Sequence, residues 1–227
     1  MNDPFFLRRE STAELFLIRH GDAIPGPDEI IPSGIYDDLP LGSKGREQAR
    51  ALAERLSDTR FHAAYSSPLR RCRETAAPLI ERLVLTLTIV EDIKEIRLGE
   101  VISLPVPKGD DDLKMLTEAL RDRQLMIVRL AASTGSWDSI EGSEPSKAFR
   151  RRVVEAMNEI ARQHLGECVL VFTHGGAINA YAAEVLGLEK DFFFPCANTS
   201  ITVVRSSGDA HALFVLNDVA HLRLESK

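Results

Sequence analysis

Two short apolar segments, 15–18 and 169–172, each lead into a histidine that is followed by glycine, as His20-Gly21 and His174-Gly175. Their length and their β-branched and aromatic content predict buried strands, so each histidine is expected at a strand end. If the strands are neighbours, the two imidazoles meet at one edge of the sheet, where function is often located.

Arginines accompany these histidines. Arg19 directly follows four apolar residues, and burying a guanidinium there would be costly without an anion. A guanidinium binds two phosphate oxygens at once. The segment 66–76 places Arg70, Arg71 and Arg73 at the start of an expected helix, where free backbone amides also favour an anion. The residues therefore indicate a phosphate site.

Strands and helices alternate along the chain. This order predicts an α/β fold, a three-layer α/β/α sandwich with a mostly parallel mixed sheet whose final hairpin adds an antiparallel strand. An irregular insertion at about 99–144 is expected over the sheet edge, with a helical stretch to about residue 129, and Ser43 is expected to cap the first helix. The expected strands are 15–18, 61–66, 85–90, 169–172, 201–204 and 211–216, and the expected helices are 44–56, 68–83, 146–164 and 177–186.

Composition limits the class of protein. The chain has 227 residues, 44% hydrophobic and 27% charged, which is typical of a soluble globule and predicts one domain over 1–227. With 28 Lys and Arg against 34 Asp and Glu, the net charge of −6 argues against a nucleic-acid or membrane partner. Neither a secretory signal nor a membrane span is expected, so we expect a cytoplasmic protein, and its 3 cysteines fit reduced thiols.

Several common sites are excluded by spacing. The chain lacks a Walker loop, a Gly-x-Gly dinucleotide fingerprint and a Gly-x-Ser-x-Gly elbow. A cysteine phosphatase would need an arginine six residues after its cysteine, and here those positions hold Pro78, His174 and Thr202. No zinc-type His or Cys spacing is visible, so neither a metal nor a cofactor is expected.

Four blocks together resemble a known family. LFLIRHGD, SSPLRRCRETA, EIRLGE and VLVFTHGGAI occur in the order found in the histidine phosphatase superfamily, in its phosphoglycerate mutase-like branch. The resemblance runs from Leu15 to Leu186 and implies the same sandwich fold. The acid-phosphatase branch is disfavoured, because its second histidine is followed by Asp whereas this chain has Gly175.

The resemblance implies a role for each matching residue. His20 matches the nucleophile that becomes phosphohistidine, while Arg19, Arg71 and the second catalytic histidine, His174, match the set that holds the phosphoryl group. Arg71 is preferred to Arg70 because the family's Arg-x-x-x-Thr-Ala pattern begins at Arg71.

Glu95 matches the acid that protonates the leaving oxygen and then activates water. Its identity stays open at this point, because neighbouring carboxylates compete for the same role. The alternatives are Asp22, Glu91, Asp92 and Glu100.

The implied activity is hydrolysis of a small phosphorylated metabolite through phosphohistidine. Phosphoglycerate mutase-type transfer is the alternative, and Asp22-Ala23-Ile24 departs from the Ser-Trp-Asn continuation of the mutases. A noncatalytic phosphoryl-binding module is a third possibility. The physiological substrate and the oligomeric state are not fixed by the sequence.

Overall fold

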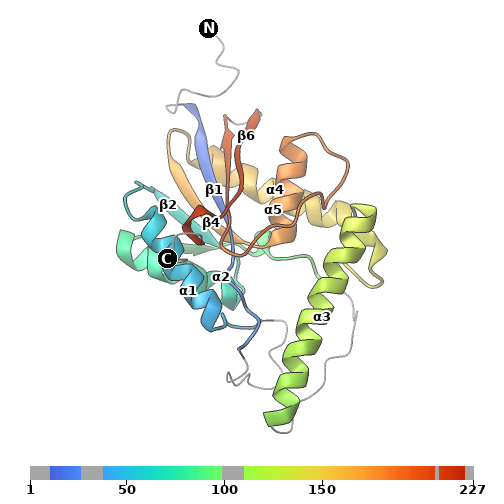
Figure 1. The fold of residues 1–227 in the computed structure, drawn as a ribbon. Helices are drawn as coiled ribbons and strands as arrows, with labels where there is room; N and C mark the ends of the chain where they lie inside the picture. The colour runs from blue at the N-terminus through green and yellow to red at the C-terminus, as the bar shows by residue number, and fades with distance from the viewer. Residues whose placement is uncertain (1–10, 27–37, 99–109, 208–209, 223–227) are drawn as a thin grey trace.

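The computed structural model describes residues 11–26, 38–98, 110–207 and 210–222. Six strands form one sheet in the order β3-β2-β4-β1-β5-β6 (Figure 1). Their bounds are β1 Ala13–Arg19, β2 Ala63–Ser66, β3 Leu87–Ile89, β4 Cys168–Thr173, β5 Ile201–Ser206 and β6 His211–Asp218. Each expected strand is present, with its ends shifted by a few residues.

The strand directions confirm the expected mixed sheet. Strands β1, β2, β3 and β4 are mutually parallel, β5 runs antiparallel to β1, and β6 runs antiparallel to β5. β1 and β4 are neighbours in a register that pairs Arg19 with Thr173. The residues that follow these two strands therefore leave the sheet side by side.

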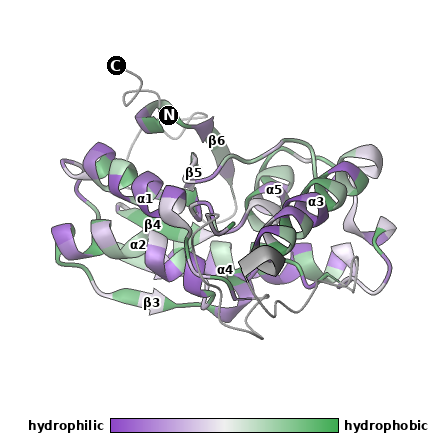
Figure 2. Cartoon of the chain, turned by 60° about the horizontal axis from the view of Figure 1, so that its bottom comes forward, coloured by the Kyte–Doolittle hydropathy of each residue, from purple (hydrophilic) through white to green (hydrophobic). Residues whose placement is uncertain are grey.

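Helices cover both faces of the sheet, which confirms the three-layer sandwich. One core cluster packs α1 (Ser43–Leu56) and α2 (Arg70–Leu83) onto one face, and the other cluster packs α4 (Ser146–Gln163) and α5 (Gly175–Val185) onto the opposite face. Figure 2 shows purple and green alternating along α1 and α2, as expected for helices that bury one side. Residues Phe149, Val153 and Met157 of α4 are fully buried along its inner side.

The start of α1 differs from the expectation. Ser43 is the first helical residue, and Gly42 occupies the cap position without a side-chain cap. Tertiary docking determines this start, because the Gly42 amide donates to the Asp22 carbonyl over 2.9 Å. A Cβ at Gly45 would lie 2.1 Å from that carbonyl oxygen, so only glycine lets the first turn approach the loop after β1 so closely.

The insertion also differs from the expectation. Its helix, α3 (Asp110–Thr134), is longer than expected and is followed by the short helix η3 (Trp137–Ser139). It does not lie over either edge strand, β3 or β6, but beside the carboxyl end of β1 (Figure 1), where Leu116 and Leu120 pack with Ala23 and Leu39. Burial of these apolar residues explains its position. Residues 27–37 between β1 and α1, residues 99–109 of the insertion and residues 208–209 of the hairpin turn lie outside the described residues.

Other boundaries follow local chemistry. α2 begins at Arg70 rather than Pro68, and α5 begins at Gly175 because His174 is extended and occupies the cap position. Among the described residues, no helix is both long enough and apolar enough to cross a membrane.

Candidate active site

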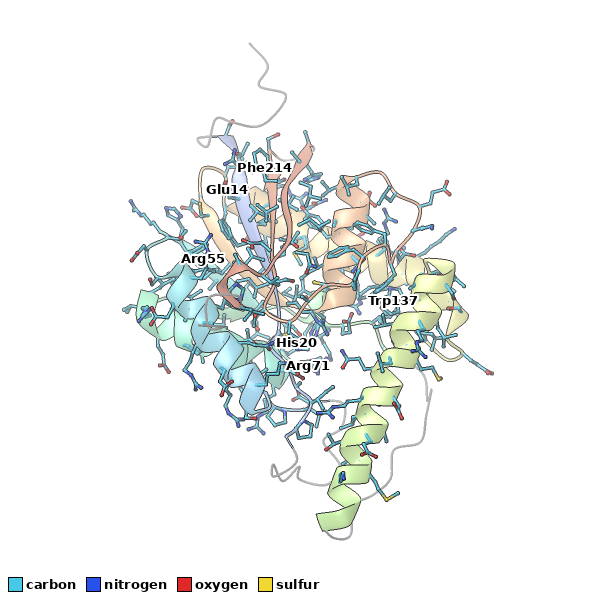
Figure 3. All side chains as sticks on the ribbon, in the orientation of Figure 1. Glu14, His20, Arg55, Arg71, Trp137 and Phe214 are labelled. Atoms are coloured by element: carbon cyan, nitrogen blue, oxygen red, sulfur yellow. The ribbon has the colours of Figure 1, made fainter. Side chains whose placement is uncertain are left out.

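The two histidines meet at the carboxyl edge of the sheet, as the sequence predicts. The His20 amide donates to the Thr173 carbonyl over 3.0 Å, which continues the β1–β4 pairing to the strand ends. The ring centroids of His20 and His174 are 5.2 Å apart. Figure 3 shows His20 and Arg71 at this end of the sheet.

Hydrogen bonds fix the reactive nitrogen of His20. Its Nδ1 lies 2.7 Å from the Gly21 carbonyl oxygen, which can only accept, so the proton is assigned to Nδ1. The Nε2 lone pair is then free to accept from Arg71 Nε at 3.2 Å. Burial, followed by the charges of Arg71 and Arg19, holds the pKa of His20 well below 6.5. The ring is therefore neutral at physiological pH, and Nε2 can act as a nucleophile.

His174 is held by one residue from the connection between β2 and α2 and by one from the first turn of α2. Its Nε2 lies 2.9 Å from Ser67 Oγ, and its Nδ1 lies 3.4 Å from Arg71 Nη2. Burial and the Arg71 charge also lower the pKa of His174 well below 6.5. Cys72 Sγ lies 3.5 Å from His174 Nε2, but burial raises the pKa of this thiol to about 12, so it stays protonated and does not compete as a nucleophile.

The charges around the histidines suit an anion. Arg19 donates through Nη1 to the Cys196 carbonyl, while its Nε is buried with no hydrogen-bond partner in the described part of the chain. Helices α2 and α5 both begin at the site with no acidic residue in the first turn, and one first-turn amide of each already donates to a carboxylate, Arg70 to Asp38 and Gly176 to Glu95. Two guanidinium groups and two helix N-termini thus converge where a phosphoryl group would bind.

Arg71 and Arg70 point to different environments. Arg70 pairs with Glu74 at 2.6 Å, and its side chain is 48% exposed. Arg71, by contrast, contacts both histidines. This geometry supports the choice of Arg71 over Arg70 as the arginine of the site.

Glu95 lies beside the second histidine, because the amide of Gly176 donates to Glu95 Oε2 over 3.1 Å. A Cβ on Gly176 would come within 2.2 Å of Glu95 Oε1, so the absence of a side chain there makes room for the carboxylate. The alternatives are placed differently. Glu91 is 71% exposed and pairs with Lys94, and Asp22 Oδ1 accepts from the Ile24 amide. The remaining two alternatives are Asp92, which is exposed, and Glu100, which lies outside the described residues.

Arg152 of α4 holds the segment that carries Glu95. Its guanidinium donates to the carbonyl oxygens of Asp92, Lys94 and Glu95 at 2.7, 2.9 and 3.2 Å. The same group binds both carboxylate oxygens of Glu144 at 2.8 Å, and this hydrogen bonding to Arg152 lowers the pKa of Glu144. The backbone of the segment that carries Glu95 is therefore fixed by hydrogen bonds from the Arg152 guanidinium.

Three polar residues of the site have no role that the sequence motifs predict. Ser67 orients His174, and Thr75 accepts from the Gly21 amide at 2.9 Å while donating to the Arg71 carbonyl. Asn198 donates to the His20 carbonyl over 3.1 Å. Ser67 and Thr75 lie in the sequence block around Arg71, so their place in that block could have indicated that they belong to the site. Asn198 lies outside all four blocks, so no sequence motif indicates its contact with His20.

This geometry defines a class of site: a neutral imidazole nucleophile beside two arginines, with a carboxylate next to the second histidine. Such a site can transfer a phosphoryl group to nitrogen, because the arginines neutralise the oxygens that gain charge. Within the described part of the chain, no group of three or more His, Cys, Asp or Glu residues is arranged to hold a metal ion.

The chain belongs to the histidine phosphatase superfamily (branch 1), whose family profile matches residues 15–219. It is 29% identical to phosphoglycerate mutase-like protein 4 of Arabidopsis thaliana, covering 92% of this chain and 87% of that protein. It is 28% identical to the metal-independent phosphoserine phosphatase of the same plant, covering 92% and 83%. The mycobacterial glucosyl-3-phosphoglycerate phosphatase superposes with a TM-score of 0.70 at 25% identity, covering 92% and 100%.

Proposed function

We propose that this histidine phosphatase hydrolyses phosphomonoesters of small metabolites without a metal ion, through a phosphohistidine on His20. The observation that carries the proposal is the state of His20: Nδ1 is bonded to the Gly21 carbonyl, and Nε2 faces Arg71. Relatives named as phosphatases, one of them metal-independent, support this reaction.

The reaction has two balanced steps. Nε2 of His20 attacks phosphorus as the P–O bond to the leaving group breaks, and Glu95 gives its proton to the leaving oxygen. A water molecule then attacks the phosphohistidine, Glu95 takes its proton, and the P–N bond breaks to release phosphate and neutral His20. Arg19, Arg71 and His174 hold the three equatorial oxygens in both steps.

We also propose that the chain forms a single domain over residues 1–227 and that the protein is cytoplasmic. Mutase-type transfer is the second candidate function, favoured by the mutase-like name of one relative. A mutase must keep water from the phosphohistidine, so it differs in the fate of the phosphoryl group.

The test is phosphate release from p-nitrophenyl phosphate in the presence of a chelator. The wild type should turn over, His20→Ala should lose nearly all activity, and His62→Ala, which changes an exposed histidine outside the site, should behave as the wild type. Equal activity of the wild type and His20→Ala would exclude His20 as the nucleophile. Loss of wild-type activity with the chelator would exclude the metal-free mechanism.

A further inference from the structure

Helix α3 bridges the two sides of the active site. Near its N-terminal end, Leu116 and Leu120 are buried against Leu39 and Ala23, and Ala23 lies three residues after His20. Near its C-terminal end, Ile127 packs on the core cluster that contains Trp137. Figure 3 places Trp137 at that end of α3, with His20 and Arg71 across from the helix.

Trp137 lies close to Gly176, which follows His174 by two residues. A Cβ on Gly176 would lie 3.1 Å from Trp137 Cζ2, and Gly176 is the residue whose amide holds Glu95. The inner side of α3 between Leu120 and Ile127 therefore faces the space between these two supports. A side chain on this inner side of the helix is therefore directed towards that space.

Of the charged residues in that stretch, Arg121 and Asp122 are exposed, whereas Arg123 is half-buried on the inner side. It follows Leu120 by three positions and precedes Ile127 by four, and these spacings put all three on one helix face. Its Nε is buried and has no hydrogen-bond partner within the described residues. An unpaired N–H at a buried Nε is unfavourable, so a ligand that supplies the missing acceptor would stabilise this arginine.

Other arginines of the chain show the contrast. Arg150 and Arg152 are bonded to carboxylates of the protein. Within the described residues, the one other arginine with a buried, unpartnered Nε is Arg19, which belongs to the candidate phosphoryl site. Arg123 therefore shares with Arg19 a buried Nε that has no acceptor among the described residues.

We propose that Arg123 binds a second anionic group of the substrate, a carboxylate a few bonds from the phosphoester. This inference rests on the proposed phosphatase function and narrows its substrate class to acidic phosphomonoesters. A carboxylate matches the guanidinium because two parallel N–H···O bonds can form between them. Arg123 is thus a specificity-determining residue, and it takes no part in transfer to His20.

The test uses two substrates that differ only in the carboxylate, O-phosphoserine and O-phosphoethanolamine. The wild type should prefer O-phosphoserine. Arg123→Gln should lower kcat/KM for O-phosphoserine by about 10- to 100-fold, mainly through KM, because a hydrogen bond to a charged group is lost. Its kcat/KM for O-phosphoethanolamine and p-nitrophenyl phosphate should stay near the wild-type value.

Two further variants separate recognition from folding. Arg123→Lys keeps the charge and should recover part of the preference, whereas Arg129→Gln, a change at an exposed position of the same helix, should leave both substrates unaffected. Equal losses on both substrates, or no loss with Arg123→Gln, would overturn the assignment. So would a wild type that hydrolyses the two substrates equally. Failure of the wild type on p-nitrophenyl phosphate would instead count against the phosphatase function itself.

Discussion

A methyl group at position 176 would test whether Glu95 acts as the acid. In Gly176→Ala the new Cβ would lie 2.2 Å from Glu95 Oε1 and 3.1 Å from Trp137 Cζ2. The carboxylate is the flexible end of a side chain and can move away, so the fold is preserved. In the middle of a helix alanine is favoured over glycine by about 0.5–1 kcal/mol, and at the second residue of α5 a part of that gain offsets some of the crowding. We therefore expect the melting temperature to change by only about 2–4 °C.

The effect on catalysis should be larger and should depend on the leaving group. General acid catalysis contributes about 10²–10⁴-fold, so displacing Glu95 should cost about 100-fold in kcat/KM for an alkyl phosphate such as glycerol phosphate. By the rate equation this is about 2.7 kcal/mol. p-Nitrophenolate leaves without a proton, so its phosphate ester should lose far less. Steady-state kcat/KM with the two substrates measures the difference.

A double-mutant cycle with Glu95→Gln completes this test. If both changes act through the same carboxylate, the double variant should be no slower on glycerol phosphate than Glu95→Gln alone. Two results would refute the reasoning: equal losses on both substrates, or single effects that multiply in the double variant.

Two further predictions concern ionisable side chains that are buried or partly buried. The pKa values of His20 and His174 lie well below 6.5, mainly through burial. Below pH 6.5 the unfolded chain therefore binds protons that the native chain does not, so the free energy of unfolding decreases as the pH is lowered. Chemical denaturation should show that His20→Asn removes about 1.4 kcal/mol per pH unit of that slope, and an unchanged slope would contradict the assignment. Arg152→Met removes the ion-pair partner of Glu144 and the donor of 3 carbonyl oxygens, which should lower the unfolding free energy by about 2–3 kcal/mol and the melting temperature by about 4–12 °C. The exposed neighbour change Arg151→Met should have little effect, and equal melting temperatures for the two variants would count against this network.

The parts of the fold that local sequence determines were predictable. The apolar runs before His20 and His174 are long enough to be strands and too short to be helices, and they appear as β1 and β4 in adjacent positions. Because those strands are parallel neighbours, the placement of both histidines at one edge follows from their positions in the sequence.

Features that depend on distant contacts were not predictable. The start of α1 is set by the approach of Gly45 to Asp22 rather than by the capping preference of Ser43. Asn198 reaches the His20 carbonyl across 178 positions, and Arg152 reaches the Glu95 carbonyl across 57. Such contacts leave no local pattern, so a carboxylate surrounded by other acidic residues could not be singled out until its partners were placed.

The central claim is that the phosphoryl group passes through Nε2 of His20. The most direct measurement is rapid quenching of the wild type during turnover of p-nitrophenyl phosphate, under alkaline conditions that preserve a P–N bond, followed by peptide mapping by mass spectrometry. The account predicts phosphorylation on the peptide that contains His20, none on the peptide that contains His174, and no phosphopeptide from His20→Ala. Label on another residue, or turnover with no phosphorylated peptide at any quench time, would contradict it.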